Sequence, residues 1–403
     1  MNWKQTTLGE ISSNIQTGPF GSQLHQSDYS ENGIPVVMPK DILNGHVSDI
    51  SIARVPEEYA NRLNRHKIEP GDILYSRRGD VGRCAFTTDI EAGWLCGTGC
   101  LRVTIDQRKA IPKFVFYQLQ KTETIGWVEK HAVGSTMLNL NTSILSNVPI
   151  QIPSIDKQRF IVGVLSAYNN LIENNQKQIK LLEEAAQRLY KEWFVDLRFP
   201  GHENTKITDG VPEGWRMAVL SEIASVNKES ISKQYPYDYV DYIDIGSVSK
   251  GQISSVTRLS TKDAPGRAKR IAFDGDVLWG MVRPNLKSYA LVFHPKETSV
   301  FSTGFAILHA EKVPFSFLYC HVTQDEFVSY LINCTNGAAY PAVKPSHFEN
   351  AVLLVPTDMV LSKFHSLVGQ MFRQAEILEQ KNQQAIEARD RLLPKLMSGE
   401  IEV

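Results

Sequence analysis

The chain has 403 residues, 42% of them hydrophobic, and its 43 lysines and arginines against 44 acidic residues give a net charge of −1. This length allows two or three domains with cores of their own, and the lack of any run of about 18 apolar residues excludes a membrane-spanning helix. The near-zero charge argues against a broad basic surface for nucleic acid but is compatible with a local basic patch.

The cysteines and the first residues predict a cytoplasmic protein. Five scattered cysteines do not suit a disulfide framework and fit a reducing compartment. The first ten residues are polar and lack the apolar stretch of a signal peptide. Cys96 and Cys100 lie close in sequence, but no second Cys or His pair follows at zinc-site spacing, so we predict no metal site.

One sequence unit occurs twice. A shift of about 204 residues brings a series of landmarks into register in unchanged order, which indicates an internal duplication. The matching pairs are Trp3 with Trp215, Leu8–Ile11 with Leu220–Ile223, Gly71–Leu74 with Gly275–Leu278, Thr98-Gly99 with Thr303-Gly304, Ile111-Pro112 with Val313-Pro314, and Ser143–Asn147 with Ser346–Asn350.

Each copy begins with a mixed α+β domain, which we place at residues 1–153 and 204–356. Short apolar runs separated by turn residues, such as those at 71–76 and 100–105, predict short strands. Residues 111–120, like their counterparts in the second copy, carry a proline near a helical first turn and predict a helix.

Each copy ends with a long helix, which we place within residues 154–203 and 357–403. Apolar residues recur every seven positions, which is the pattern of a coiled coil. Pro200-Gly201 is expected to end the first helix, and Pro394 and Gly399 the second. The residues predicted to form the seam between the helices are Ile172, Ile179, Leu182, Leu189, Trp193, Met371, Leu378 and Leu392.

Two equivalent long helices favour pairing with each other, and Asn175 falls within the seam, where a buried amide can fix the register. The alternative is an ordinary amphipathic helix that packs on its own domain. A pseudo-two-fold repeat makes the paired helices antiparallel, with the domains at opposite ends. A helix of about 39 residues spans about 58 Å, so the domains would lie more than one DNA turn of about 34–36 Å apart.

These motifs resemble the specificity subunits of type I restriction-modification systems. The residues that carry the resemblance are Trp3 with Leu8–Ile11, Gly71–Leu74 with Arg77–Gly79, Leu145–Pro153 with Gln158 and Ile161, and Phe348–Pro356. The resemblance covers the whole chain through the order, spacing and duplication of the motifs. One departure is that Ser362–Phe364 stands in the second copy where Gln158–Phe160 stands in the first, so the glutamine of the second helix start is missing.

The resemblance implies a particular division of labour. Each target-recognition domain would read one half of a split site in double-stranded DNA, and the antiparallel helices would set the length of the unread gap. Two modification subunits would dock on the helices and supply an adenine methyltransferase together with its S-adenosylmethionine, and a translocating restriction subunit can join them. Because the loops of the two copies differ, the target should be asymmetric.

The sequence carries no motif for catalysis of its own. A DNA methyltransferase needs an (N/D)PP(Y/F) tetrapeptide and a nucleotide-driven motor needs GxxxxGK[ST], and neither occurs. HExxH and GxSxG are also absent. We therefore predict a non-catalytic subunit with no metal or cofactor on this chain.

Two pairs of turn-rich loops at equivalent points of the repeat are the candidate DNA contacts. They are residues 76–83 with 279–287, and residues 134–141 with 337–344. Base edges are read by Arg, Lys, Asn, Gln and Ser, and phosphates are held mainly by Arg and Lys. The predicted DNA-binding residues are Lys40, Arg77, Arg78, Arg83, Ser135, Asn139, Asn141, Arg267, Lys269, Arg270, Arg283, Lys287, Tyr340 and Lys344.

Two other functions compete with this one. The chain can be an interaction scaffold whose domains bind no DNA, which the near-zero charge favours. It can also be a standalone enzyme, which the missing motifs disfavour. Surface loops with solvated charges are the structural alternative for each predicted DNA-binding residue.

Overall fold

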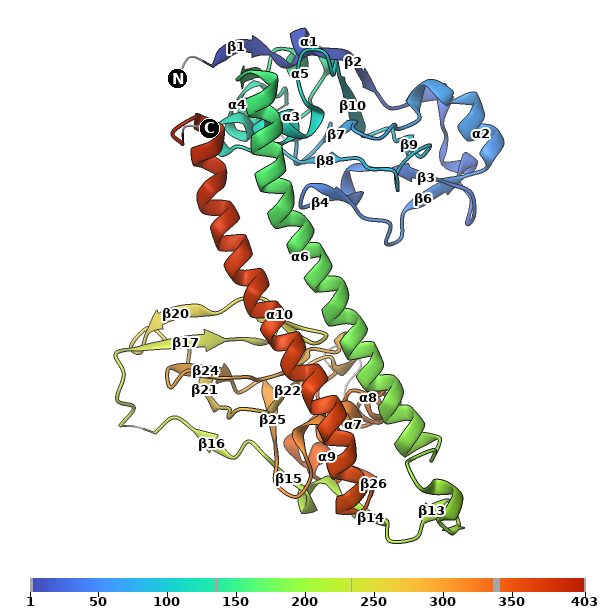
Figure 1. Ribbon diagram of the computed structural model, residues 1–403, viewed down its shortest axis with the longest axis vertical. Helices are drawn as coiled ribbons and strands as arrows, with labels where there is room; N and C mark the ends of the chain where they lie inside the picture. The colour runs from blue at the N-terminus through green and yellow to red at the C-terminus, as the bar shows by residue number, and fades with distance from the viewer. Residues whose placement is uncertain (1–2, 135–136, 233, 336–340, 402–403) are drawn as a thin grey trace. The chain divides into compact units, whose positions relative to one another are not determined.

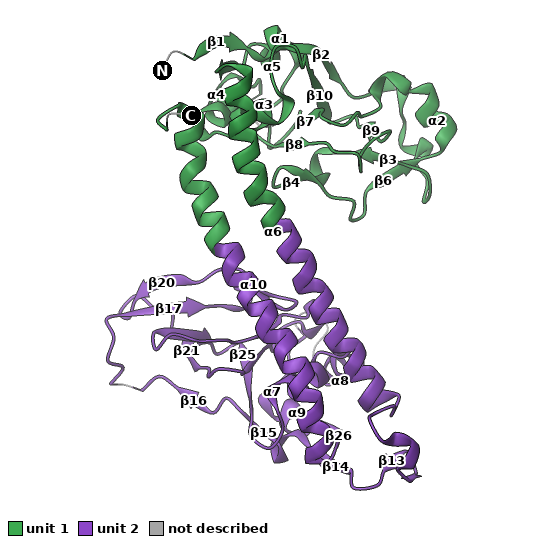
Figure 2. Ribbon diagram, viewed as in Figure 1, with its two compact units in different colours: residues 1–172, 384–403 green, residues 173–383 purple. Residues whose placement is uncertain are grey.

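The computed structural model describes residues 3–134, 137–232, 234–335 and 341–401. The chain forms two compact units, and each takes residues from both long helices (Figures 1 and 2). Unit 1 comprises Met1–Ile172 with Gln384–Val403, and unit 2 comprises Glu173–Gln383.

Unit 1 is built on a four-stranded antiparallel sheet in the order β2-β10-β7-β8. Its strands are β2 (Ser12–Thr17), β10 (Cys100–Ile105), β7 (Ile73–Ser76) and β8 (Cys84–Phe86). Strand β7 is buried along its whole length because Ile73 and Tyr75 face one apolar cluster and Leu74 faces another. This explains why the strand has a continuous apolar sequence and not an alternating one.

Smaller elements complete unit 1. Strand β1 (Lys4–Thr7) pairs with β11 (Pro149–Ile152), which joins the two ends of the domain. A second sheet has the order β6-β3-β9, and β4 pairs with β5. The remaining bounds are β3 (Ile34–Val37), β4 (Ile42–Leu43), β5 (His46–Val47), β6 (Ala53–Val55), β9 (Leu95–Cys96), α1 (Leu8–Ile11), α2 (Glu57–Arg62), α3 (Pro112–Leu119), α4 (Thr122–His131) and α5 (Thr142–Ser146).

Unit 2 repeats this topology. Its four-stranded antiparallel sheet has the order β15-β25-β22-β23, and β14 pairs with β26 as β1 does with β11. These strands are β15 (Ala224–Val226), β25 (Phe305–Ala310), β22 (Val277–Gly280), β23 (Tyr289–Leu291), β14 (Arg216–Val219) and β26 (Val352–Val355). Helices α7 (Phe315–Val322), α8 (Asp325–Asn333) and α9 (Pro345–Glu349) follow the sheet in the order of α3, α4 and α5.

The units differ most in the second sheet. In unit 2 it has five strands in the order β16-β21-β24-β17-β20, where unit 1 has three. The bounds are β16 (Glu229–Ser230), β21 (Ala268–Ile271), β24 (Ser299–Ser302), β17 (Tyr239–Ile243) and β20 (Thr257–Ser260). Two hairpins, β12 (Ile207–Thr208) with β13 (Val211–Pro212) and β18 (Val248–Ser249) with β19 (Gln252–Ile253), complete the unit.

The Gly-Asp pairs of the repeat form the same turn in both units. Gly71 and Gly275 have φ angles of 89° and 85°, in the left-handed region that favours glycine. The buried Asp72 carboxylate accepts hydrogen bonds from the Glu69 amide (2.8 Å) and the Thr104 hydroxyl (2.5 Å). Its counterpart Asp276 accepts from the Phe273 amide at 2.7 Å. Burial raises the pKa of both carboxyl groups. The duplicated motif is therefore structural.

Helix α6 (Ile155–Tyr190) continues into one π-helical turn (Lys191–Val195), and α10 spans Asp358–Ser398. The prediction that Pro394 ends the second helix is wrong, because Pro394 lies inside α10. A proline removes one helical hydrogen bond, but Leu396 and Met397 just beyond it are buried in the core of unit 1 and keep the turn helical. The helix ends at Ser398, and Gly399 follows it with a φ of 75°.

Within each unit the two helices run antiparallel. In unit 2 the Asn175 side-chain amide donates a hydrogen bond to the side-chain oxygen Oδ1 of Asn382 at 2.9 Å. The centre of the Trp193 ring lies 5.8 Å from that of the Phe364 ring. Residues later in α6 thus contact residues earlier in α10, as expected for antiparallel helices. In unit 1, Arg389 of α10 donates to the Asn169 side chain of α6 at 3.0 Å.

The predicted seam residues divide between two environments. Ile179, Ala375 and Leu378 form a small cluster between the helices, with Leu182 packed against it. The others pack on the domains or are buried outside that cluster: Trp193, Leu189 and Met371 belong to the core of unit 2, Leu392 packs on the core of unit 1, and Ile172 is buried. Pairing of the helices and packing on the domains therefore both occur.

Candidate DNA-recognition loops

In unit 1 the two predicted loops lie side by side. The loop between β7 and β8 (residues 77–83) is hydrogen-bonded to the segment before α5. The Gly79 amide donates to the Leu138 carbonyl at 3.1 Å, and the Leu140 amide donates to the Arg77 carbonyl at 2.8 Å. Arg78 and Asn139 face each other in the resulting bridge. Segments far apart in sequence thus form one surface.

The side chains of this surface have different roles. Arg78 is exposed and Arg77 is half-buried. The guanidinium of exposed Arg83 pairs with Asp80, which offsets part of its charge. Asn139 is half-buried, and the Asn141 side chain accepts the Ile144 amide at 2.8 Å as the N-cap of α5. Asn141 therefore has a structural role, and Ser135 lies outside the described residues.

Lys40 belongs to a neighbouring turn. It is exposed on the 3₁₀ turn Pro39–Asp41, and its ammonium donates to the Ser51 carbonyl at 3.3 Å. Pro39 packs on Gly99 so closely that a Cβ at Gly99 would lie 2.7 Å from its ring. The Gly99 carbonyl in turn accepts the Arg77 amide at 2.8 Å. A third segment therefore joins the two loops.

Unit 2 has the same frame of backbone hydrogen bonds between its loops, formed by different residues. The Met281 amide donates to the Gly304 carbonyl at 2.9 Å, as Arg77 does to Gly99. The Val343 amide donates to the Met281 carbonyl at 2.9 Å, and Val282 faces Ala342 where Arg78 faces Asn139 in unit 1. The repeat thus keeps backbone hydrogen bonds while it changes the side chains they present.

The basic residues of this second frame lie around the loop between β22 and β23 (residues 281–288). Arg283 is exposed and its amide donates to the Pro341 carbonyl at 2.8 Å. The Lys287 ammonium pairs with Asp325 of α8 at 2.6 Å. Lys344 is exposed before α9. Tyr340 lies outside the described residues.

Arg267 joins the same region, whereas Lys269 and Arg270 continue along β21. The Arg267 carbonyl accepts the Thr303 amide at 2.8 Å, next to Gly304. Its guanidinium donates to the Tyr242 hydroxyl at 3.0 Å. Lys269 is exposed, and half-buried Arg270 donates to the Ser230 hydroxyl at 3.3 Å. Within the residues that the structure describes, no hydrogen bond or ion pair joins these last two side chains to the loops.

Sequence reasoning missed the residues that hold these cations and segments. Asp80 pairs with Arg83, and Asp325 pairs with Lys287. Gly99 and Gly304 connect the third segment to the loop of their own unit. The repeated Thr-Gly pair was the available signal for the two glycines. The Lys287–Asp325 ion pair has no sequence signal, because the two residues come from separate elements.

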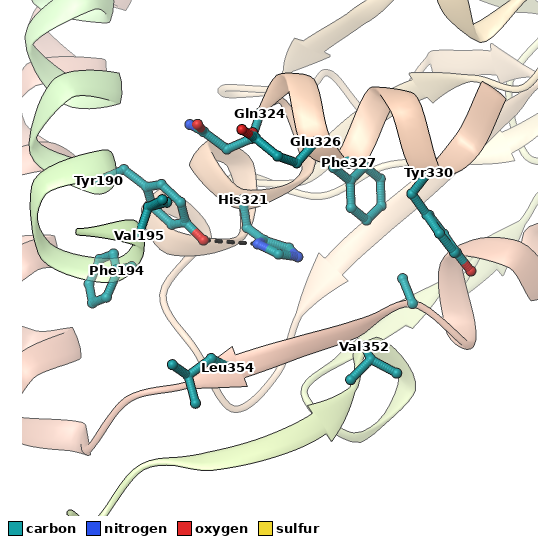
Figure 3. Close-up of a pocket in the computed structure, with 11 residues that line it drawn as sticks. Tyr190, Phe194, Val195, His321, Gln324, Glu326, Phe327, Tyr330, Val352 and Leu354 are labelled. Carbon is teal, nitrogen blue, oxygen red and sulfur yellow. Dashed lines mark hydrogen bonds between the residues drawn. The ribbon is translucent and has the colours of Figure 1, made fainter. Parts of the chain in front are cut away.

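A cavity of about 290 Å³ in unit 2 is a different kind of site (Figure 3). It is lined by the end of α6, by α7 and α8, and by β26. The Tyr190 hydroxyl and His321 Nδ1 are hydrogen-bonded at 2.8 Å, and burial lowers the pKa of His321 to about 4, so the imidazole is neutral. The described residues that line the cavity include no lysine or arginine, so it does not suit a phosphate backbone.

In the described part of the chain, no group of three or more His, Cys, Asp or Glu side chains is placed to hold a metal ion. No helix among those residues is both long and apolar enough to cross a lipid bilayer.

Known proteins share this architecture. Residues 1–184 match the family model of the type I restriction modification DNA specificity domain. The type I restriction enzyme MjaIX specificity subunit of Methanocaldococcus jannaschii is 27% identical over 93% of this chain and 88% of its own length. The HindI specificity subunit of Haemophilus influenzae is 22% identical over 99% of this chain and 100% of its own.

A solved structure supports the same assignment of fold. The type I restriction-modification S subunit from M. genitalium superposes with a TM-score of 0.62 at 15% identity, over 98% of this chain and 96% of that chain. The mixed α+β units and the antiparallel helices are thus the fold of that subunit. The matching family model over residues 1–184 and the full-length relatives show that this chain is similar to type I restriction-modification specificity subunits, and the solved S subunit shares its fold.

Proposed function

We propose that each unit of this non-catalytic subunit reads one half of a split, asymmetric site in double-stranded DNA. The observation that carries the proposal is the conserved backbone frame with different side chains. Arg78 and Asn139 occupy the bridge in unit 1, and Val282 and Ala342 occupy it in unit 2. Arginine and asparagine side chains read purine edges in the major groove, whereas valine and alanine offer only apolar contact. Two unlike readers on one frame fit a target whose halves differ.

The long helices are the proposed docking sites for two modification subunits, which would supply the methyltransferase and its S-adenosylmethionine. Large apolar side chains are exposed along both helices, and exposed apolar surface marks protein interfaces. They are Phe160, Leu171 and Leu181 on α6, and Met359, Leu367 and Ile377 on α10. A restriction subunit that translocates DNA would join this assembly, and the helices would set the length of unread DNA. All five cysteines are free, which fits assembly in the cytoplasm.

The test is the methylation pattern of a host that carries this chain and its modification subunits. Mapping methylated adenines with and without the chain should give one bipartite sequence. Arg78→Ala should relax or weaken recognition of one half only, by about 10- to 100-fold as for a contact to a base, and Arg283→Ala should weaken binding of the other half only. Arg108→Ala, at an exposed arginine of unit 1 outside the loops and the long helices, is the matched control and should change neither half.

Three outcomes would contradict the proposal. A host methylation pattern that does not depend on this chain would leave it without a reading function. DNA retention by the assembled complex that is insensitive to both arginine substitutions and to salt would favour a scaffold that binds no DNA. Methyl transfer from S-adenosylmethionine to DNA by the isolated chain would make it an enzyme.

A further inference from the structure

A large apolar side chain lies exposed at the tip of the basic loop of unit 2. Leu286 is 59% exposed, and it follows Asn285, which is also exposed. Arg283 and Lys287 flank this tip within the loop. A single exposed leucine needs no explanation on most surfaces. Here it stands between two cations on the surface that is proposed to face DNA.

The tip is held in one conformation. Pro284 is buried beneath it, the Arg283 amide is bonded to Pro341, and the Lys287 ammonium is bonded to Asp325. Arg283 and Lys287 have φ angles of 51° and 54°, a region that long side chains rarely adopt. Strained residues of this kind persist where surrounding contacts fix them, and they concentrate at functional sites. Leu286 is therefore presented on a rigid support.

We propose that Leu286 is a wedge that enters the DNA half-site of unit 2 and partly unstacks one base step. The proposal rests on the proposed function of the loops. Proteins that bend DNA insert leucine, phenylalanine or methionine between neighbouring base pairs. Arg283, three residues before the wedge in the same loop, would hold a phosphate beside the opened step.

Unit 1 offers an internal comparison. In its equivalent loop the exposed side chains are polar, with Arg78 and Asp80 at the tip, and Val81 is only 1% exposed. Residues 77–83, all of which are described, therefore present no large apolar side chain to solvent. The β7–β8 loop of unit 1 thus has no counterpart of Leu286, although Met137 in the neighbouring loop is 62% exposed, so the stacking change that depends on Leu286 should be confined to the half-site read by unit 2.

The experiment uses the complete complex with modification subunits and its mapped DNA site. The fluorescent base 2-aminopurine replaces single bases in each half-site in turn, at every position except the methylated adenine, because that base can leave the stack for catalysis. The wild-type complex should raise the fluorescence several-fold at one step of the half-site read by unit 2. Leu286→Ala should abolish that rise and weaken binding roughly 10-fold. Leu286→Met should keep most of it.

Matched variants separate the wedge from the charges. Arg283→Ala should reduce the slope of log affinity against log salt by about one, whereas Leu286→Ala should leave it unchanged. Val256→Ala removes an exposed apolar side chain elsewhere in unit 2 and should alter neither readout. A fluorescence rise that persists in Leu286→Ala would overturn the wedge. Failure of the wild-type complex to bind the mapped site would instead overturn the proposed function.

Discussion

Glu183 is a carboxylate in unit 2 whose protonation should control stability. It projects from α6 toward Gly251 in the β18–β19 hairpin. A Cβ added at Gly251 would lie 3.2 Å from the Glu183 Oε1 atom and 3.7 Å from the Tyr319 hydroxyl. Lys250 of the same hairpin and Glu379 of α10 are the charges that face it. Burial is the largest cause that raises the pKa of Glu183 from 4.5 to about 7, and the Glu379 charge adds to it.

A raised pKa fixes the sign of the effect. The folded protein holds this proton more tightly than the unfolded chain, so the contribution to stability is complete below pH 4.5 and is lost as the pH rises through about 7. At about 1.4 kcal/mol per tenfold change in proton affinity, the rise corresponds to about 3 kcal/mol. Partial exposure of the side chain reduces the expected effect to about 1–2 kcal/mol.

Glu183→Gln removes the buried charge and keeps the shape of the side chain. The variant should melt about 3–6 °C higher than the wild type at pH 8, and the difference should shrink toward zero at pH 5. Thermal melts followed by circular dichroism across this range measure it. Glu184→Gln is the matched control: its carboxylate is 44% exposed and lies near Lys180 and Arg188, so it should give no such gain. A Glu183→Gln difference that is independent of pH would refute the reasoning.

Two further predictions concern buried amides, and urea denaturation measures both. Asn175→Leu leaves the Asn382 amide buried without its partner and should lower the free energy of unfolding by about 1–3 kcal/mol. Adding Asn382→Leu should recover most of this loss. If the losses from the two substitutions add instead, the two residues do not share a bond. Gln158→Leu removes the bonds from Gln158 to the Ile111 amide (2.8 Å) and the Pro153 carbonyl (2.9 Å), and should cost about 1–3 kcal/mol; unchanged stability would show that neither bond contributes.

The duplication made much of the fold predictable. Landmarks such as Gly71 and Gly275 recur because only a residue without a Cβ adopts the turn easily. Apolar residues at intervals of seven located both helices. The pattern nevertheless missed Asn382, because a polar residue in a seam gives no apolar signal. It also misplaced the effect of Pro394, because burial of Leu396 and Met397 depends on a core formed by residues remote in sequence.

The sequence located the loops but did not show how they are arranged in space. The repeat marked residues 76–83 and 279–287 as equivalent, but it contained no local sign that Gly79 bonds to Leu138 or Arg283 to Pro341. Long-range backbone pairing of this kind follows from the tertiary fold. The helix starts required a correction: the structural counterpart of Gln158 is Leu361 and not Ser362, because the Gln158 amide bonds to Ser154 and the Leu361 amide to Thr357 in the first turn. Gln158 and Leu361 are both buried, so an apolar contact in unit 2 replaces the hydrogen bonds of unit 1.

The division of residues between the units affects how the chain folds during synthesis. All of unit 2 lies within residues 173–383, so it can form once that segment has left the ribosome. Unit 1 begins earlier but needs residues 384–403, because Leu396 and Met397 close its core. Until those residues have been translated, part of the apolar core of unit 1 stays exposed to solvent and to chaperones. The first domain to be made is thus the last to be finished, and a chain released after residue 383 would contain one complete domain and one whose apolar core is open and prone to aggregate.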